Sequence, residues 1–151
     1  MAIMDERTLF GENFDIGQAT GSYLMTNQVD LGLTGRDIGN GYPVYLNIVI
    51  DEAVTSGTSS TVAFELRSDA AAAINTSTGS LHFSSGAIAH TALTLGTKLS
   101  FFIPLNNAVP YERYLGCIAV VAGATTTAGT CTAWLGLEPV AGWKAYPEGS
   151  N

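Results

Sequence analysis

The two histidines are the residues of this sequence best suited to proton transfer or metal binding. His82 and His90 lie eight positions apart among Ser, Ala and Thr residues, a spacing that would place both on one face of a single strand. Gly86 lies between them and predicts a turn, and neither histidine has the Ser and Asp neighbours of a catalytic triad. Metalloenzymes need a larger set of His and carboxylate ligands. We therefore expect ordinary surface or edge histidines and no metal site.

Two further motifs of catalytic type also predict ordinary structure. Gly39 and Gly41 resemble the start of a dinucleotide fingerprint, but position 44 is Val and no helix pattern follows. They predict a tight turn with positive φ before a strand. The adjacent carboxylates at 5–6 and 51–52 would point to opposite faces of a strand, which favours solvated strand ends over a catalytic pair. We expect no enzymatic activity, no catalytic residue and no cofactor.

Cys117 and Cys131 are too few for a disulfide framework or a four-cysteine zinc site. Their strands are expected to pair as a hairpin, and with Ala124 at its centre the two side chains would be directly opposite. The first ten residues carry Asp5, Glu6 and Arg7 and lack the apolar core of a signal peptide, so synthesis in the cytoplasm is expected. Thiols stay reduced there, which favours two buried free cysteines.

Composition limits the class of protein. The chain has 151 residues, of which 46% are hydrophobic and 13% charged, which excludes intrinsic disorder and argues against long surface helices. The net charge is −7 and the six basic residues stand alone, so direct nucleic-acid binding is not expected. No run of about 20 apolar residues predicts a membrane span.

Short strands must position any site in this chain. Val44, Leu46, Ile48 and Ile50 are apolar at every second position, which is the period of a strand. Similar patterns predict about eight strands, at 28–31, 44–51, 62–67, 81–83, 88–95, 99–103, 114–121 and 131–138, and one short helix at 70–74. Without long helices to make crossovers, the pattern favours an all-β fold, an antiparallel β-sandwich of jelly-roll type.

The segments outside these strands predict two arms. We expect an extended N-terminal arm at 1–27, a jelly-roll β-sandwich at 28–138 and a C-terminal arm at 139–151. Apolar residues in the first arm would lie on its own domain or on a partner. Trp143 in the second arm would either fold back onto its own sandwich or bind a partner.

Several motifs resemble the jelly-roll capsid cement proteins of tailed bacteriophages. They are Val29 to Gly32 followed by Gly35 to Tyr45 (GRDIGNGYPVY), Glu112 to Gly116 (ERYLG) after a proline-containing loop, and Thr127 to Gly129 running into Cys131 to Glu138. Asp5 to Phe10 and Trp143 to Pro147 are similar to the arms of that family. The chain departs from the pattern at 117–121, where an apolar run replaces a more polar aromatic one.

The resemblance implies a structural virion protein. Such a decoration protein would bind the outer surface of an icosahedral phage head, link neighbouring major capsid proteins and stabilise the shell against internal DNA pressure. Its partners would be the major capsid protein and itself, as a homodimer or alternatively a trimer. The expected interface residues are Met4, Leu9, Phe10, Phe14, Arg36, Arg113, Trp143 and Tyr146. Removing residues 1–14 is expected to abolish capsid binding without unfolding the sandwich.

An alternative function is a jelly-roll carbohydrate-binding or host-attachment domain of a phage virion. Trp134, Trp143 and the tyrosines would then stack on sugar rings. Trp134 alternates with Cys131, Ala133, Leu135 and Leu137, so it would face away from the core if they form it. Loss of glycan binding on Trp134→Ala would favour this alternative.

Overall fold

A computed structural model describes residues 5–32, 41–104 and 109–141 of the chain. These residues form strands with two 3-10 turns. The elements are η1 (Glu6–Thr8), β1 (Leu9–Asp15), β2 (Gly21–Leu24), β3 (Val29–Asp30), β4 (Tyr45–Ser56), β5 (Thr61–Asp69), β6 (Ser80–Ser84), β7 (Ile88–Ala89), η3 (His90–Ala92), β8 (Lys98–Phe102), β9 (Tyr114–Ala122) and β10 (Thr126–Gly136). The all-β prediction is confirmed.

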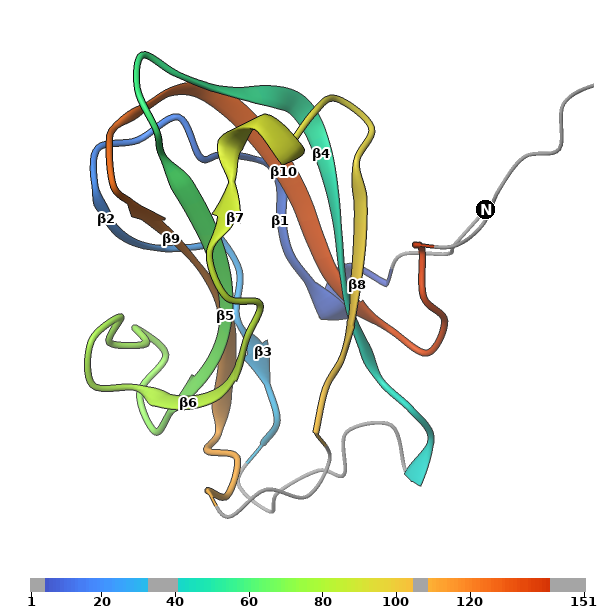
Figure 1. Cartoon of the computed structure of the whole chain (residues 1–151). Helices are drawn as coiled ribbons and strands as arrows, with labels where there is room; N and C mark the ends of the chain where they lie inside the picture. The colour runs from blue at the N-terminus through green and yellow to red at the C-terminus, as the bar shows by residue number, and fades with distance from the viewer. Residues whose placement is uncertain (1–4, 33–40, 105–108, 142–151) are drawn as a thin grey trace, which may run out of the picture.

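Two antiparallel sheets face each other across one core (Figure 1). Sheet A has the strand order β1-β10-β4-β8, and sheet B has the order β2-β9-β5-β6. β3 also pairs with β9, and β7 also pairs with β5. Since β2 and β3 share one edge of β9, and β6 and β7 share one edge of β5, the ten segments occupy eight strand positions. Their order in the two sheets is that of a jelly roll, as predicted.

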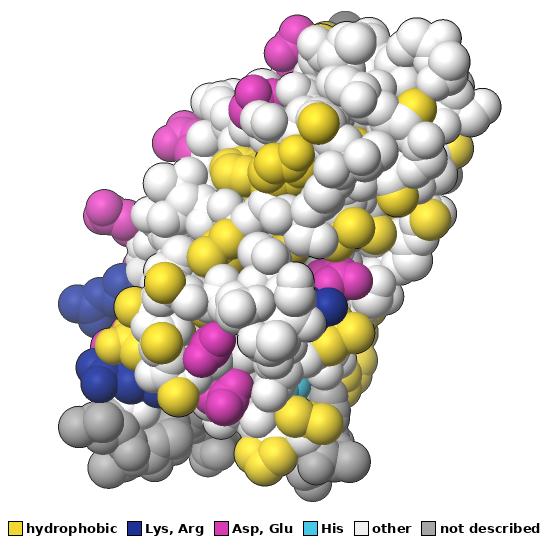
Figure 2. All heavy atoms as spheres, turned by 90° about the vertical axis from the view of Figure 1, so that its left-hand side faces the viewer, with side chains coloured by type: hydrophobic (Ala, Val, Ile, Leu, Met, Phe, Trp, Pro, Cys, Tyr) yellow, Lys and Arg dark blue, Asp and Glu magenta, His cyan; other side chains and the backbone are white. Residues whose placement is uncertain are grey.

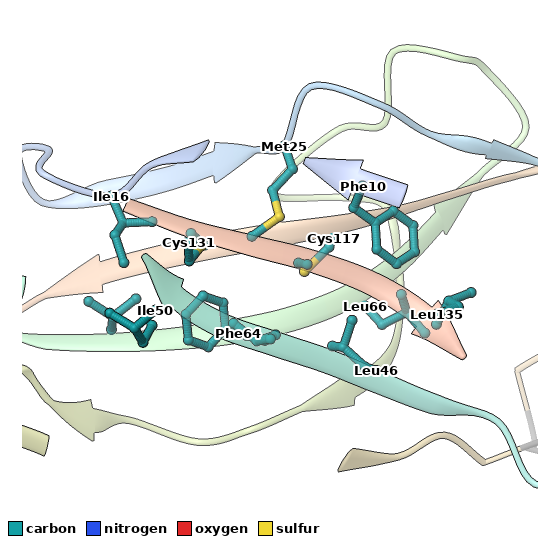
Figure 3. Close-up of a cluster of buried hydrophobic side chains, with 14 of the residues drawn as sticks. Phe10, Ile16, Met25, Leu46, Ile50, Phe64, Leu66, Cys117, Cys131 and Leu135 are labelled. Carbon is teal, nitrogen blue, oxygen red and sulfur yellow. The ribbon is translucent and has the colours of Figure 1, made fainter. Parts of the chain in front are cut away.

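Alternation along the strands explains why the two sheets pack together. In β5 every second residue is buried, and the buried set includes Val62, Phe64 and Leu66. The buried side chains of both sheets meet between them, as the close-up of the core shows (Figure 3). Burying a side chain of this size contributes about 1.5–3 kcal/mol, so this layer supplies most of the drive to fold.

The predicted N-terminal arm is wrong for residues 9–24. β1 pairs with β10 and β2 pairs with β9, so this segment supplies an edge strand to each sheet. Phe10, Ile16 and Met25 are buried in the common core. The sequence signal is weak because β1 is irregular: its pairing with β10 has two register shifts and Asn13 has a φ of 49°. Such a bulged strand lacks a sustained period of two.

The predicted hairpin of the last two strands is also wrong. β9 pairs with β5 in sheet B, whereas β10 pairs with β4 in sheet A, so the connection at 123–125 passes from one sheet to the other. Cys117 and Cys131 therefore approach the core from opposite sheets (Figure 3). Both are buried and free, which confirms the prediction of unbonded thiols.

Two other local predictions fail at loops. Residues 70–73 form bends and residue 74 is irregular, so the predicted helix at 70–74 is wrong: Asp69 accepts the backbone amides of Ala71 and Asn75 and so closes a loop. The strand predicted at 88–95 ends after Ala89 and gives way to η3. Gly41 has a φ of 83°, which confirms the expected positive φ there, while Gly39 lies outside the described residues.

Candidate binding surface

The clearest candidate site is an exposed apolar surface at one end of sheet A. β10 ends, β4 begins and β8 ends at this point, and the register places Gly136, Tyr45 and Phe102 in one row across the three strands. Tyr45 and Phe102 make an edge-to-face contact, with ring centroids 6.0 Å apart. Phe102 is 55% exposed, and Leu137, directly after β10, and Tyr42, three residues before β4, are 60% and 66% exposed. We call Tyr42, Tyr45, Phe102 and Leu137 the apolar end of sheet A.

The start of the predicted C-terminal arm crosses the outer face of sheet A beside this surface. Asn47 on β4 donates from Nδ2 to the carbonyl of Glu138 at 2.9 Å and accepts the amide of Val140 at 3.0 Å. Ser100 on β8 accepts the amide of Ala141 at 2.9 Å. Two side chains of the sheet therefore fix the backbone of residues 138–141 close to Phe102.

The outer face of sheet B is partly covered by the chain itself. Ile74 is 4% exposed and Ile118 is fully buried, although both lie outside the main core cluster. A Cβ atom at Gly116 would lie only 2.6 Å from Ile74 Cδ1 and 2.9 Å from Leu24 Cδ1, so the 70–79 loop packs down onto β9. Figure 2 looks onto the side where β2 and β9 lie and shows several separate hydrophobic groups among backbone and other side chains.

Four of the expected interface residues, Leu9, Phe10, Phe14 and Arg113, lie in the described part of the chain. Phe10 is fully buried, and Leu9 and Phe14 are half-buried, with Leu9 opposite Trp134 and Phe14 opposite Cys131 in the pairing with β10. Phe10 is thus a core residue. Met4, Arg36, Trp143 and Tyr146 lie outside the described residues.

Arg113 is held by a neighbouring carboxylate. Its Nε donates to Asp30 Oδ1 and one terminal nitrogen donates to Oδ2, both at 3.0 Å, and its guanidinium lies 4.9 Å from the centre of the Tyr114 ring. The hydrogen bonds to Asp30 raise the pKa of Arg113. The pair is more than one-third exposed, so solvent screening leaves it little effect on stability. The side chain's charge is largely neutralised locally.

Trp134 is the aromatic residue on which the sugar-binding alternative depends, and it is 5% exposed. It lies on the outer face of sheet A, as its alternation predicts, in register with Leu9 on β1 and Asn47 on β4. A ring that is covered to this degree has no free face on which a sugar could stack.

Sequence reasoning missed a polar cluster around His82. Ser68 Oγ lies 2.6 Å from His82 Nε2 and accepts the amide of Glu112 at 3.0 Å. The imidazole stacks on Tyr111 with centroids 4.0 Å apart. These residues come from three separate segments, and only the sheet register brings them together. His90 lies elsewhere, with Nδ1 3.2 Å from the carbonyl oxygen of Ser60.

This cluster is not arranged for nucleophilic catalysis. Ser68 is fully buried and His82 is 6% exposed. Burial lowers the pKa of His82 from its ordinary 6.5, and the charge of Glu112 partly opposes this. Burial also raises the pKa of Tyr111 to about 12. A hydroxyl at such a position cannot reach a substrate, since a nucleophile must be accessible to the bond that it attacks.

Metal ligation and membrane crossing each need a feature that the described ranges do not contain. Over residues 5–32, 41–104 and 109–141, no three His, Cys, Asp or Glu side chains are grouped so that they could hold a metal ion. Within the same residues, no helix has the length and apolarity needed to cross a membrane.

Comparison with known proteins places most of the chain in one family. No curated protein matches the sequence. A family model described as Bbp16 matches residues 14–135, which run from the end of β1 almost to the end of β10. The match therefore spans nearly all of the jelly roll, including both strands that carry Asn47 and Trp134. The chain belongs to the Bbp16 family.

Proposed function

We propose that this chain is a structural virion protein of a tailed bacteriophage. It binds the outer surface of the icosahedral head as a decoration protein and links neighbouring major capsid proteins. The resemblance of its motifs to capsid cement proteins supports this proposal, and so does its membership of the Bbp16 family. In this proposal the chain is not an enzyme and uses no cofactor, and its other partner is a second copy of itself.

The apolar end of sheet A is the observation that carries the proposal. Phe102, Leu137 and Tyr42 are each more than half exposed, although the sandwich has a continuous core of its own. Aromatic side chains supply much of the binding energy of protein interfaces when a partner covers them. The proposed contact with the coat protein is therefore this surface, in place of the N-terminal segment expected from sequence.

Binding of this kind would stabilise the shell by linkage. A ligand that binds the assembled lattice and not the free subunits stabilises the lattice by RT ln(1 + [L]/Kd) per site. At a hundredfold excess over Kd this is about 2.7 kcal/mol per site. A dimer that reaches two coat subunits would add avidity, because its second contact forms at a high effective concentration.

Co-sedimentation with mature, undecorated capsids of the same phage tests the proposal. We expect saturable binding near one copy per coat subunit and a higher melting temperature of the shell. A parallel measurement on a glycan array separates the two candidate functions. Absence of capsid binding at concentrations where the protein remains folded would overturn the decoration role, and reproducible glycan binding would then favour a host-attachment domain.

A further inference from the structure

A buried histidine connects sheet B to the chain segment that leads into β9. We call residues 111–113 the lead-in segment. His82 on β6 contacts Ser68 on β5 at 2.6 Å and stacks on Tyr111 of the lead-in segment. Ser68 in turn accepts the amide of Glu112 at 3.0 Å. One imidazole, 6% exposed, therefore contacts both a strand and the lead-in segment at the end of the sandwich.

The directions of these hydrogen bonds assign the protonation state of His82. The Glu112 amide can only donate, so Ser68 Oγ accepts its hydrogen. The Ser68 hydroxyl proton then needs an acceptor, and in the described part of the chain the hydrogen-bonding atom beside it is His82 Nε2. Nε2 must be unprotonated to accept it. We therefore assign a neutral imidazole here, with Nε2 as the acceptor of the Ser68 hydroxyl and the ring proton on Nδ1.

Protonation would break this arrangement. A proton on Nε2 converts that atom from an acceptor to a donor, which leaves the hydroxyl proton of Ser68 without its acceptor at a fully buried position. Leaving a buried polar group unsatisfied costs free energy, and so does placing a charge in a buried site. Both costs apply only while His82 is buried in this cluster. A His82 side chain exposed to water would incur neither of them.

Among the described residues, the charged groups around His82 do not cancel these effects. Glu112 in the lead-in segment favours the protonated form, but burial has the larger influence and lowers the pKa of His82. Tyr111 remains neutral, since its own pKa is raised to about 12. From β5 the residue that faces His82 is Ser68. Its neighbours Arg67 and Asp69 point to the opposite face, where Arg67 pairs with Glu65 and Asp69 closes the following loop.

We propose that His82 is an acid-sensitive latch: its neutral form holds the lead-in segment against β5 and β6, and its protonation releases that segment. The segment is well placed to transmit the change. The hydroxyl of Tyr111 donates to the carbonyl of Pro104 at 2.7 Å, just after β8 in the other sheet, and Arg113 pairs with Asp30 on β3. Release would therefore loosen links to both sheets at this end of the sandwich.

The direction of the pH dependence follows from the lowered pKa. Between the folded pKa and 6.5, the released chain binds more protons at His82 than the latched chain. The latch therefore contributes its full stabilisation above pH 6.5 and loses it as the pH falls through the folded pKa. Each pH unit between the folded pKa and 6.5 changes the equilibrium constant between the latched and the released chain by about tenfold.

Amide hydrogen exchange of the full chain tests the latch. We expect the protection factor of the Glu112 amide, corrected for intrinsic exchange, to fall between about pH 7.5 and about pH 5. The amide of Met25, which donates to Cys117 within the core, is the internal reference and should lose less protection. Equal protection of Glu112 at both pH values would overturn the proposal.

His82→Gln and His90→Gln form a matched pair of variants. Gln at 82 offers an acceptor oxygen that does not titrate, so the acid-induced loss at Glu112 should disappear; His90 lies outside the cluster, so His90→Gln should retain the loss. A loss that persists in folded His82→Gln contradicts the latch.

If His82→Gln does not fold, NMR titration of the wild-type imidazole tests the proposal instead. We expect an apparent pKa below 6.5, with the neutral ring protonated on Nδ1. A value at or above 6.5 overturns the proposal.

Discussion

The hydroxyl of Ser100 donates a hydrogen bond of 2.7 Å to the side-chain oxygen of Asn47, across neighbouring strands on the outer face of sheet A. Asn47 is fully buried although it lies on this outer face, because residues 138–141 cover it. The same two side chains satisfy two backbone amides and one backbone carbonyl of that segment. A polar pair on a sheet surface thus replaces the backbone pairing that an extra strand would provide.

Replacing Asn47 should therefore release this segment. Asn47→Leu removes three hydrogen bonds and leaves the backbone groups of Glu138 and Val140 without these partners. We expect a loss of about 2 kcal/mol or more in the free energy of unfolding, measured in urea, and faster exchange of the Val140 amide. Ser100→Ala removes fewer contacts and should cost about 1 kcal/mol. Equal costs for the two variants would contradict the central position of Asn47.

The role of the apolar end of sheet A in capsid binding can be tested by comparing a substitution there with one at an exposed residue elsewhere. Phe102→Ser should weaken capsid binding by tenfold or more, since it removes an aromatic contact from the proposed interface. Leu95→Ser is the matched control, because Leu95 is 71% exposed and precedes β8, whereas Phe102 ends it. Co-sedimentation gives the affinities, and urea unfolding checks that both variants remain folded. Weaker binding by Leu95→Ser alone would place the interface at the other end of β8.

Removal of residues 1–14 should unfold the protein instead of producing a folded sandwich that cannot bind. The deletion removes nearly all of β1 and the fully buried Phe10. Phe10→Ala alone should cost about 3–5 kcal/mol, because it leaves a cavity in the core. Thermal unfolding followed by circular dichroism measures both effects. A deletion variant that retains the wild-type melting temperature would show that β1 contributes little to the core.

The two cysteines should be unreactive while the protein is folded. Burial raises the pKa of Cys131 to about 12 and that of Cys117 well above 9.0, so little thiolate forms near neutral pH. We expect Ellman's reagent to modify neither thiol in the native chain at about pH 8 and both after unfolding. One thiol modified rapidly in the native protein would contradict this burial.

The raised pKa values of the two thiols also predict how the stability of the folded chain changes at high pH. The unfolded chain ionises its thiols above about pH 9, while the folded chain retains their protons. The stabilisation from the neutral thiols is therefore complete below pH 9 and declines as the pH rises toward 12. A Cys117→Ala, Cys131→Ala double variant should show a smaller loss of stability than wild type over this range. An equal loss in both proteins would assign the high-pH instability to other groups.

The fold class and much of the core follow from the order of the amino acids alone. Alternation at Val62, Phe64 and Leu66 depends only on the two-residue period of a strand, and the absence of long helices excludes parallel crossovers. Burial of the two cysteines likewise follows from local hydrophobicity and their expected reduced state. Such properties depend on residues that are near one another in the chain.

The tertiary structure decided which distant residues meet. β1 is a strand because β10 offers it an edge, although its bulged sequence lacks the period that would predict one. The contact of Ser68 with His82, and that of Asn47 with Ser100, join positions 14 and 53 residues apart through the register of paired strands. A shift of one residue in that register would turn each side chain to the other face, so neither cluster can be read from spacing alone.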